Sequence, residues 1–70
     1  MTKNEYRNCI ENYLKEKELL LNSLAKHDPI LENQVKFYMF TKIFAHEHNK
    51  AKAYELNDAL WIDFINGIRN

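Results

Sequence analysis

The near absence of glycine and proline is the feature that most limits how this chain can fold. Gly67 and Pro29 are the only residues of their kinds among seventy. Turn-rich β-proteins depend on such residues at their tight turns, so a β-sandwich or a barrel is disfavoured. Hydrophobic residues make up 46% of the chain and charged residues 29%, which argues against a disordered polypeptide. The sequence therefore predicts one all-α domain over residues 1–70.

The first third of the sequence has the spacing of an amphipathic helix. At about 100° per residue, its apolar residues form one broad face. This face comprises Tyr6, Cys9, Ile10, Tyr13, Leu14, Leu20, Leu21 and Leu24. Two residues break the pattern, because Lys17 falls within the apolar face and Leu19 falls on the polar one. We predict a helix over about residues 4–26, ended by His27.

A second helix is predicted over about residues 29–47. Asp28 followed by Pro29 is typical of a helix start, with the N-cap before a proline in the first turn. The turn before it is short, so the first two helices are expected to pack antiparallel.

The apolar residues of this second helix lie on two nearly opposite sides. One side comprises Leu31, Val35, Tyr38, Met39 and Ala45; the other comprises Phe37, Phe40 and Phe44, with Ile30 close by. Both sides need cover from water. The helix is therefore either the middle of a three-helix arrangement, or it packs internally on one side and on another molecule with the other.

A third helix is predicted over about residues 51–66, and its junction with the second leaves alternatives open. A break near Asn49, in the left-handed conformation that ends helices, gives a small three-helix bundle. A continuous helix instead gives a helical hairpin that dimerises into a four-helix bundle. Asn57 lies on the apolar face of this segment, which also allows a later start with Asn57 or Asp58 as the N-cap.

Charge and cysteine content bear on partners and compartment. Ten basic residues balance ten acidic ones, whereas nucleic-acid-binding domains usually carry a basic excess. The nearest approach to a basic patch comprises Lys42, His46, Lys50 and Lys52. Cys9 is a single cysteine, the N-terminus is charged, and no apolar run approaches the roughly 18 residues that span a bilayer. We expect a cytoplasmic protein that does not enter a membrane.

Residues with catalytic or metal-binding chemistry are poorly arranged for it. His46 and His48 are two residues apart, so on a helix their rings point away from each other. Cys9 and His27 would lie about 27 Å apart along one helix, too far to act as nucleophile and base. One glycine cannot build a phosphate-binding loop. We expect no enzymatic activity, no metal or cofactor, and no small-molecule substrate.

The function that best fits these features is protein binding. We expect a non-enzymatic interaction module, a small regulator or inhibitor that binds a larger protein, or a second copy of itself in a homodimer, through an apolar helix face. Small helical chains of this kind often serve as accessory proteins in bacteria and phages. The candidate contact residues are Phe37, Phe40, Phe44, Leu19, Lys17, Ile62 and Trp61. The alternative is a small nucleic-acid-binding helical domain that uses the Lys/His surface around residues 42–52.

Overall fold

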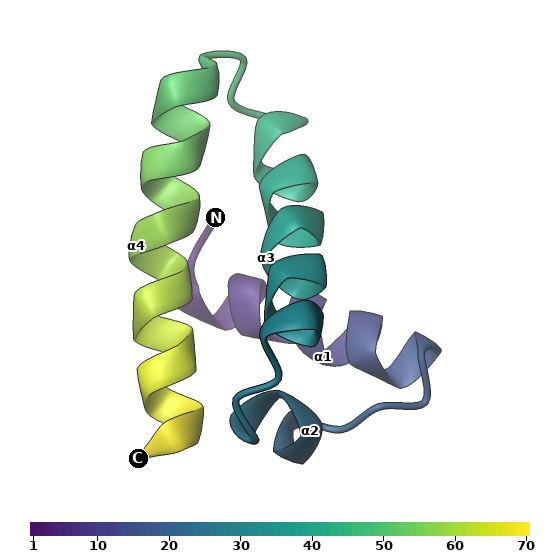
Figure 1. The fold of residues 1–70 in the computed structure, drawn as a ribbon. Helices are drawn as coiled ribbons and strands as arrows, with labels where there is room; N and C mark the ends of the chain where they lie inside the picture. The colour runs from purple at the N-terminus through teal and green to yellow at the C-terminus, as the bar shows by residue number, and fades with distance from the viewer.

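The chain forms four helices and no strand in a computed structural model that describes all of residues 1–70. The helices are α1 (Lys3–Glu16), α2 (Leu21–Ala25), α3 (Pro29–Phe44) and α4 (Lys50–Arg69). Figure 1 shows α3 and α4 side by side and antiparallel, with α1 lying crosswise behind them and the short α2 near the start of α3. The prediction of a small all-α bundle is confirmed.

Side-chain caps fix the starts of α1 and α3. Thr2 accepts a hydrogen bond from the backbone N–H of Glu5, and Asp28 accepts from those of Ile30 and Leu31. Both side chains satisfy N–H groups that have no partner within the helix. The predicted start of the second helix at Asp28-Pro29 is therefore correct.

The junction between α3 and α4 is a real break, although Asn49 does not have the predicted role. Its φ of −82° is not left-handed, and its side chain accepts a hydrogen bond from the backbone N–H of Lys52. Asn49 thus starts α4 instead of ending α3, which already ends at Phe44. The alternative of one continuous helix, and with it the dimerising hairpin, is wrong.

The prediction of one helix over residues 4–26 is wrong, because this segment forms two helices, α1 and α2. Glu18 has a φ of 59°, which is the left-handed conformation. Its N–H donates to the carbonyl of Lys15 at 3.1 Å, and the N–H of Leu19 donates to that of Leu14 at 2.8 Å. This pair of hydrogen bonds is the Schellman motif that commonly ends an α-helix.

The early end of α1 accounts for the two residues that broke the helical pattern. Lys17 is the C-cap and is exposed, with its ammonium group 5.6 Å from the centre of the Tyr13 ring. Leu19 follows the turn and packs against the core, which a continuous helix would have prevented. The turn also redirects the chain, so α1 does not pack antiparallel to α3 as predicted. The antiparallel neighbour of α3 is α4 (Figure 1).

The core lies between all four helices. Its fourteen buried hydrophobic residues are Tyr6, Ile10, Leu14, Leu24, Leu31, Val35, Met39, Phe40, Ile43, Ala53, Leu60, Trp61, Phe64 and Ile65. Asn57 is the one buried polar residue and lies within α4, so the later helix start at Asn57 or Asp58 is wrong. None of the helices combines the length and hydropathy needed to cross a bilayer.

The two sides of α3 differ in how the chain covers them. On the inner side Leu31, Val35 and Met39 are buried and Tyr38 is half-buried, and only Ala45 at the end of the helix is exposed. On the other side only Phe40 is buried, while Phe37 and Phe44 remain exposed. The expectation that both sides are covered is therefore met on one side only within this chain.

Candidate protein-interaction surface

One face of α3 points away from the rest of the chain and is exposed over the whole length of the helix. Its residues, which we call the outer stripe, are Ile30, Asn33, Gln34, Phe37, Thr41 and Phe44. They follow one another at intervals of three or four residues, the spacing that keeps side chains on one face of a helix. No member of the outer stripe carries a charge.

The hydrophobic members of the outer stripe are unusually open to water. Ile30 is 71% exposed, Phe37 66% and Phe44 41%. Singly exposed apolar residues are common on soluble proteins, but these three lie seven residues apart on one face of the same helix, with the polar Gln34 and Thr41 between them.

An aromatic cluster anchors the outer stripe to α4. Phe40 stacks on Tyr54 of α4, with ring centres 4.1 Å apart, and lies 5.6 Å from the ring of Phe44. Phe37 completes the cluster at 6.5 Å from Phe40. A hollow of about 220 Å³ opens beside Phe37, Phe40 and Tyr54. Phe40 is thus buried within the cluster, and the exposed rings of Phe37 and Phe44 lie on either side of it.

Charged residues border the outer stripe without entering it. Lys36 forms a 2.9 Å ion pair with Asp58 of α4 along one border. Along the other border, the ammonium group of Lys42 lies 5.1 Å from the centre of the Tyr38 ring, which itself stacks on Tyr13. Charged side chains therefore flank the uncharged outer stripe on both sides.

The structure places the predicted contact residues in different environments. Phe37 and Phe44 lie on the outer stripe, and Ile62 is exposed on α4. Phe40 and Trp61 are each only 8% exposed and belong to the core. Periodicity placed these aromatic residues on helix faces but did not reveal which faces the other helices cover.

The residues of the predicted Lys/His surface do not gather on one helix face. Lys42 lies in the last turn of α3 and His46 follows its end, while Lys50 and Lys52 start α4, and all four are exposed. Lys42 lies over Tyr38, whereas Lys50 lies 6.0 Å from the centre of the Tyr54 ring.

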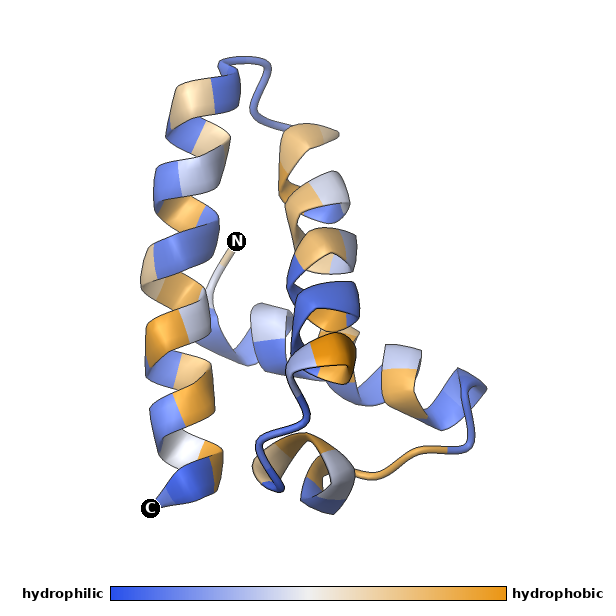
Figure 2. Cartoon of the chain, in the orientation of Figure 1, coloured by the Kyte–Doolittle hydropathy of each residue, from blue (hydrophilic) through white to orange (hydrophobic).

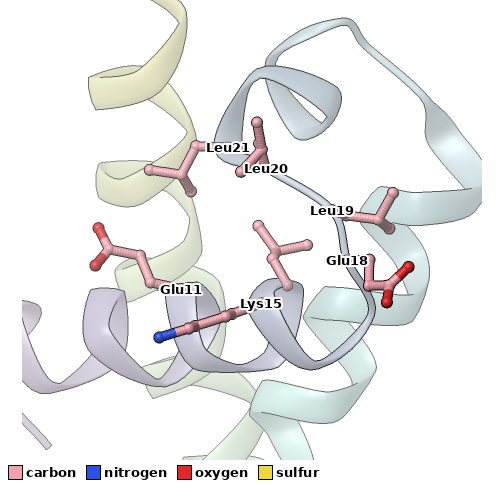
Figure 3. Close-up of a pocket in the computed structure, with 7 residues that line it drawn as sticks. Glu11, Lys15, Glu18, Leu19, Leu20 and Leu21 are labelled. Carbon is pink, nitrogen blue, oxygen red and sulfur yellow. The ribbon is translucent and has the colours of Figure 1, made fainter.

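A leucine-lined pocket between α1 and α2 was missed at the sequence level. Its volume is about 430 Å³, and Leu14, Leu19, Leu20 and Leu21 contribute its apolar wall. Figure 3 shows Leu20 and Leu21 reaching over α1 from the connection and from α2, with Lys15 of α1 beneath them. The connection appears hydrophobic in Figure 2 because it carries consecutive leucines, the one sign that could have indicated the pocket.

Titratable groups gather nowhere in a metal-binding arrangement. No group of three or more His, Cys, Asp or Glu residues is placed to hold a metal ion. Cys9 is half-buried and packs against the core. Burial, with a smaller contribution from the negative charge of Asp58, raises the pKa of Tyr6 above its ordinary value of 10.0. The Tyr6 hydroxyl is in the core, where its hydrogen bond to Asn57 is structural.

Comparison with protein-family models, with curated proteins and with solved structures finds no match to this chain. The outer stripe of α3 is therefore interpreted from its own chemistry.

Proposed function

We propose that this chain is a non-enzymatic protein-interaction module, a small regulator or inhibitor that binds another protein chain through the outer stripe of α3. The observation that carries the proposal is the uncharged line of Ile30, Phe37 and Phe44, exposed along a helix that the rest of the fold holds in place. Helices with apolar residues at this spacing commonly bind protein partners by packing that face against them.

The energy available from this surface is considerable for so small a chain. Burial of a largely exposed phenylalanine side chain such as Phe37 contributes on the order of 2 kcal/mol. Ile30 and Phe44 add comparable contributions, and aromatic residues dominate the binding energy of many interfaces. The packed α3–α4 pair also presents these side chains without folding on binding, so little conformational entropy is lost.

The test compares two variants with matched exposure in the full chain used as bait. Phe37→Glu places a charge at the centre of the outer stripe, and Leu20→Glu places one at a residue 69% exposed in the α1–α2 connection. Both variants should keep the helical circular dichroism of the wild type. Proteins captured from the source cell by the wild type should be lost with Phe37→Glu and kept with Leu20→Glu.

Salt dependence separates this function from nucleic-acid binding. An apolar contact should survive the change from low to moderate salt, whereas contacts with phosphates weaken steeply over that range. Capture that disappears with salt, or that Phe37→Glu leaves unchanged, would contradict a binding role for the outer stripe.

A further inference from the structure

The three hydrophobic residues of the outer stripe are evenly spaced, and this spacing is self-complementary. Phe37 lies seven residues after Ile30 and seven before Phe44. Seven residues span about 10.5 Å along a helix and return almost to the same face. If a second α3 lies antiparallel with a two-fold axis at Phe37, the two Phe37 rings meet, and each Ile30 meets Phe44 of the second copy.

We propose that the partner bound by the outer stripe is a second copy of this chain, with the two α3 helices antiparallel and crossing at Phe37. This inference rests on the proposed function and names its partner. In such an isologous contact the same patch is used on both chains, so the patch must complement itself.

The absence of charge on the outer stripe favours this partner. A residue close to a two-fold axis meets its own copy, so any charge there would face a like charge at close range. The side chains around Phe37 on this face are Gln34 and Thr41, both uncharged, and the charges of Lys36 and Asp58 beside it are paired with each other. The Gln34 amide can donate and accept hydrogen bonds, and the Thr41 hydroxyl, which already donates to the Tyr38 carbonyl, can accept them, so the two groups suit a contact with an identical surface.

Charges at the two ends of α3 favour the antiparallel direction. Asp28 caps the start of the helix with its carboxylate. A parallel pair would place this carboxylate beside its own copy, whereas an antiparallel pair places the two Asp28 residues at opposite ends of the contact. An antiparallel pair also brings the positive end of each helix dipole to the negative end of the other.

Stable complexes bury about 800 Å² per partner, which is roughly a sixth of the 4965 Å² surface of this chain. We expect the dimer to form in the micromolar range. Sedimentation should show the apparent mass of the full chain rising with concentration, and Phe37→Glu should abolish the rise.

Disulfide trapping tests the register of the two helices. Cys9 is first replaced in a Cys9→Ala chain so that it forms no crosslinks of its own. In that background, Phe37→Cys should form a disulfide-linked dimer on mild oxidation. Ile30→Cys alone and Phe44→Cys alone should not, because two copies of either residue would lie about 21 Å apart along the helices, beyond the reach of a disulfide. A mixture of the two single variants should crosslink, joining residue 30 to residue 44.

The control for random collision is Leu20→Cys, which is as exposed as Phe37 but lies away from the outer stripe. The antiparallel dimer would be overturned if Phe37→Cys crosslinked no faster than Leu20→Cys. It would also be overturned if Ile30→Cys crosslinked to itself.

The oligomeric state separates this inference from the proposed function. If the chain stays monomeric at high micromolar concentration, yet captures a different protein in a manner that depends on Phe37, this inference is overturned and the proposed function stays intact. A chain that dimerises unchanged with Phe37→Glu would overturn this inference, and it would refute the proposed function as well if its capture of other proteins were also unchanged.

Discussion

The hydroxyl group of Tyr6 donates a 2.7 Å hydrogen bond to Oδ1 of Asn57, joining α1 to α4 across the centre of the fold. The amide nitrogen of Asn57 in turn donates to the backbone carbonyl of Lys36 in α3 at 3.1 Å. Tyr6 and Asn57 are 1% and 2% exposed. One buried side chain thus holds the three long helices in register, and the outer stripe of α3 depends on that register for its position.

Replacing Asn57 by alanine is expected to destabilise the chain by about 3 kcal/mol. The change leaves the buried Tyr6 hydroxyl without its acceptor, at a cost of about 1–3 kcal/mol, and it removes the second hydrogen bond of the Lys36 carbonyl, which keeps its bond within α3. Tyr6→Phe should cost less, about 1–2 kcal/mol, because it removes one hydrogen bond. Urea unfolding measures both. The matched control is Asn66→Ala, an exposed asparagine on the same helix, which should change the free energy of unfolding very little.

Alkaline pH should destabilise the chain through Tyr6. Burial raises the pKa of Tyr6 in the folded chain above the 10.0 of an exposed tyrosine. Below about pH 10 the hydroxyl is protonated in both states and its contribution to stability is complete. As the pH rises further, the unfolded chain releases this proton first, so stability falls by up to about 1.4 kcal/mol for each pH unit.

Urea unfolding of the wild type and of Tyr6→Phe at about pH 9 and about pH 11 isolates this effect. The other tyrosines and the lysines titrate in both proteins, so the difference between their pH dependences reports on Tyr6. The wild type should lose more stability than the variant. Equal losses would mean that the Tyr6 hydroxyl ionises as easily in the folded chain as in the unfolded one.

The left-handed turn at Glu18 offers a stabilising substitution. A side chain at positive φ costs about 1–2 kcal/mol, and glycine avoids that cost at the expense of greater freedom in the unfolded chain. We expect Glu18→Gly to raise the free energy of unfolding by about 0.5–1 kcal/mol. Glu18→Ala removes the same carboxylate but keeps the Cβ atom, so it should give no gain. Thermal unfolding of the two variants compares them directly, and equal effects would argue for a continuous first helix.

This turn also marks where prediction from sequence succeeded and where it failed. Helical spacing and the Asp28-Pro29 start predicted the second and third helices close to their actual bounds. The first helix was predicted too long because Glu18 is not a residue that usually marks a helix end. Lys17 and Leu19 do not fit the apolar and polar faces of a continuous helix, and this mismatch is the local indication of the break.

The candidate surface could be predicted only in part, because it depends on how the helices pack against one another. Periodicity correctly separated the two sides of α3, but it says nothing about which side a neighbouring helix covers. That depends on the crosswise path of α1 and on α4, whose Tyr54 covers Phe40 and leaves Phe37 free. Asn57 appeared to be a fault in an apolar face, because its partners Tyr6 and Lys36 lie far away in the sequence.

A charged substitution should therefore destabilise the chain far more at Phe40 than at Phe37. Phe40→Asp buries a carboxylate against Tyr54 and opens a cavity, so it should cost at least about 3 kcal/mol. A domain of this size has little stability to lose, and we expect this variant to be largely unfolded. Phe37→Glu exposes its charge to water and should cost under about 1 kcal/mol. Circular dichroism with urea titration distinguishes the two. If Phe37→Glu unfolded the chain as readily as Phe40→Asp, Phe37 would be a core residue and the outer stripe would lose its central contact.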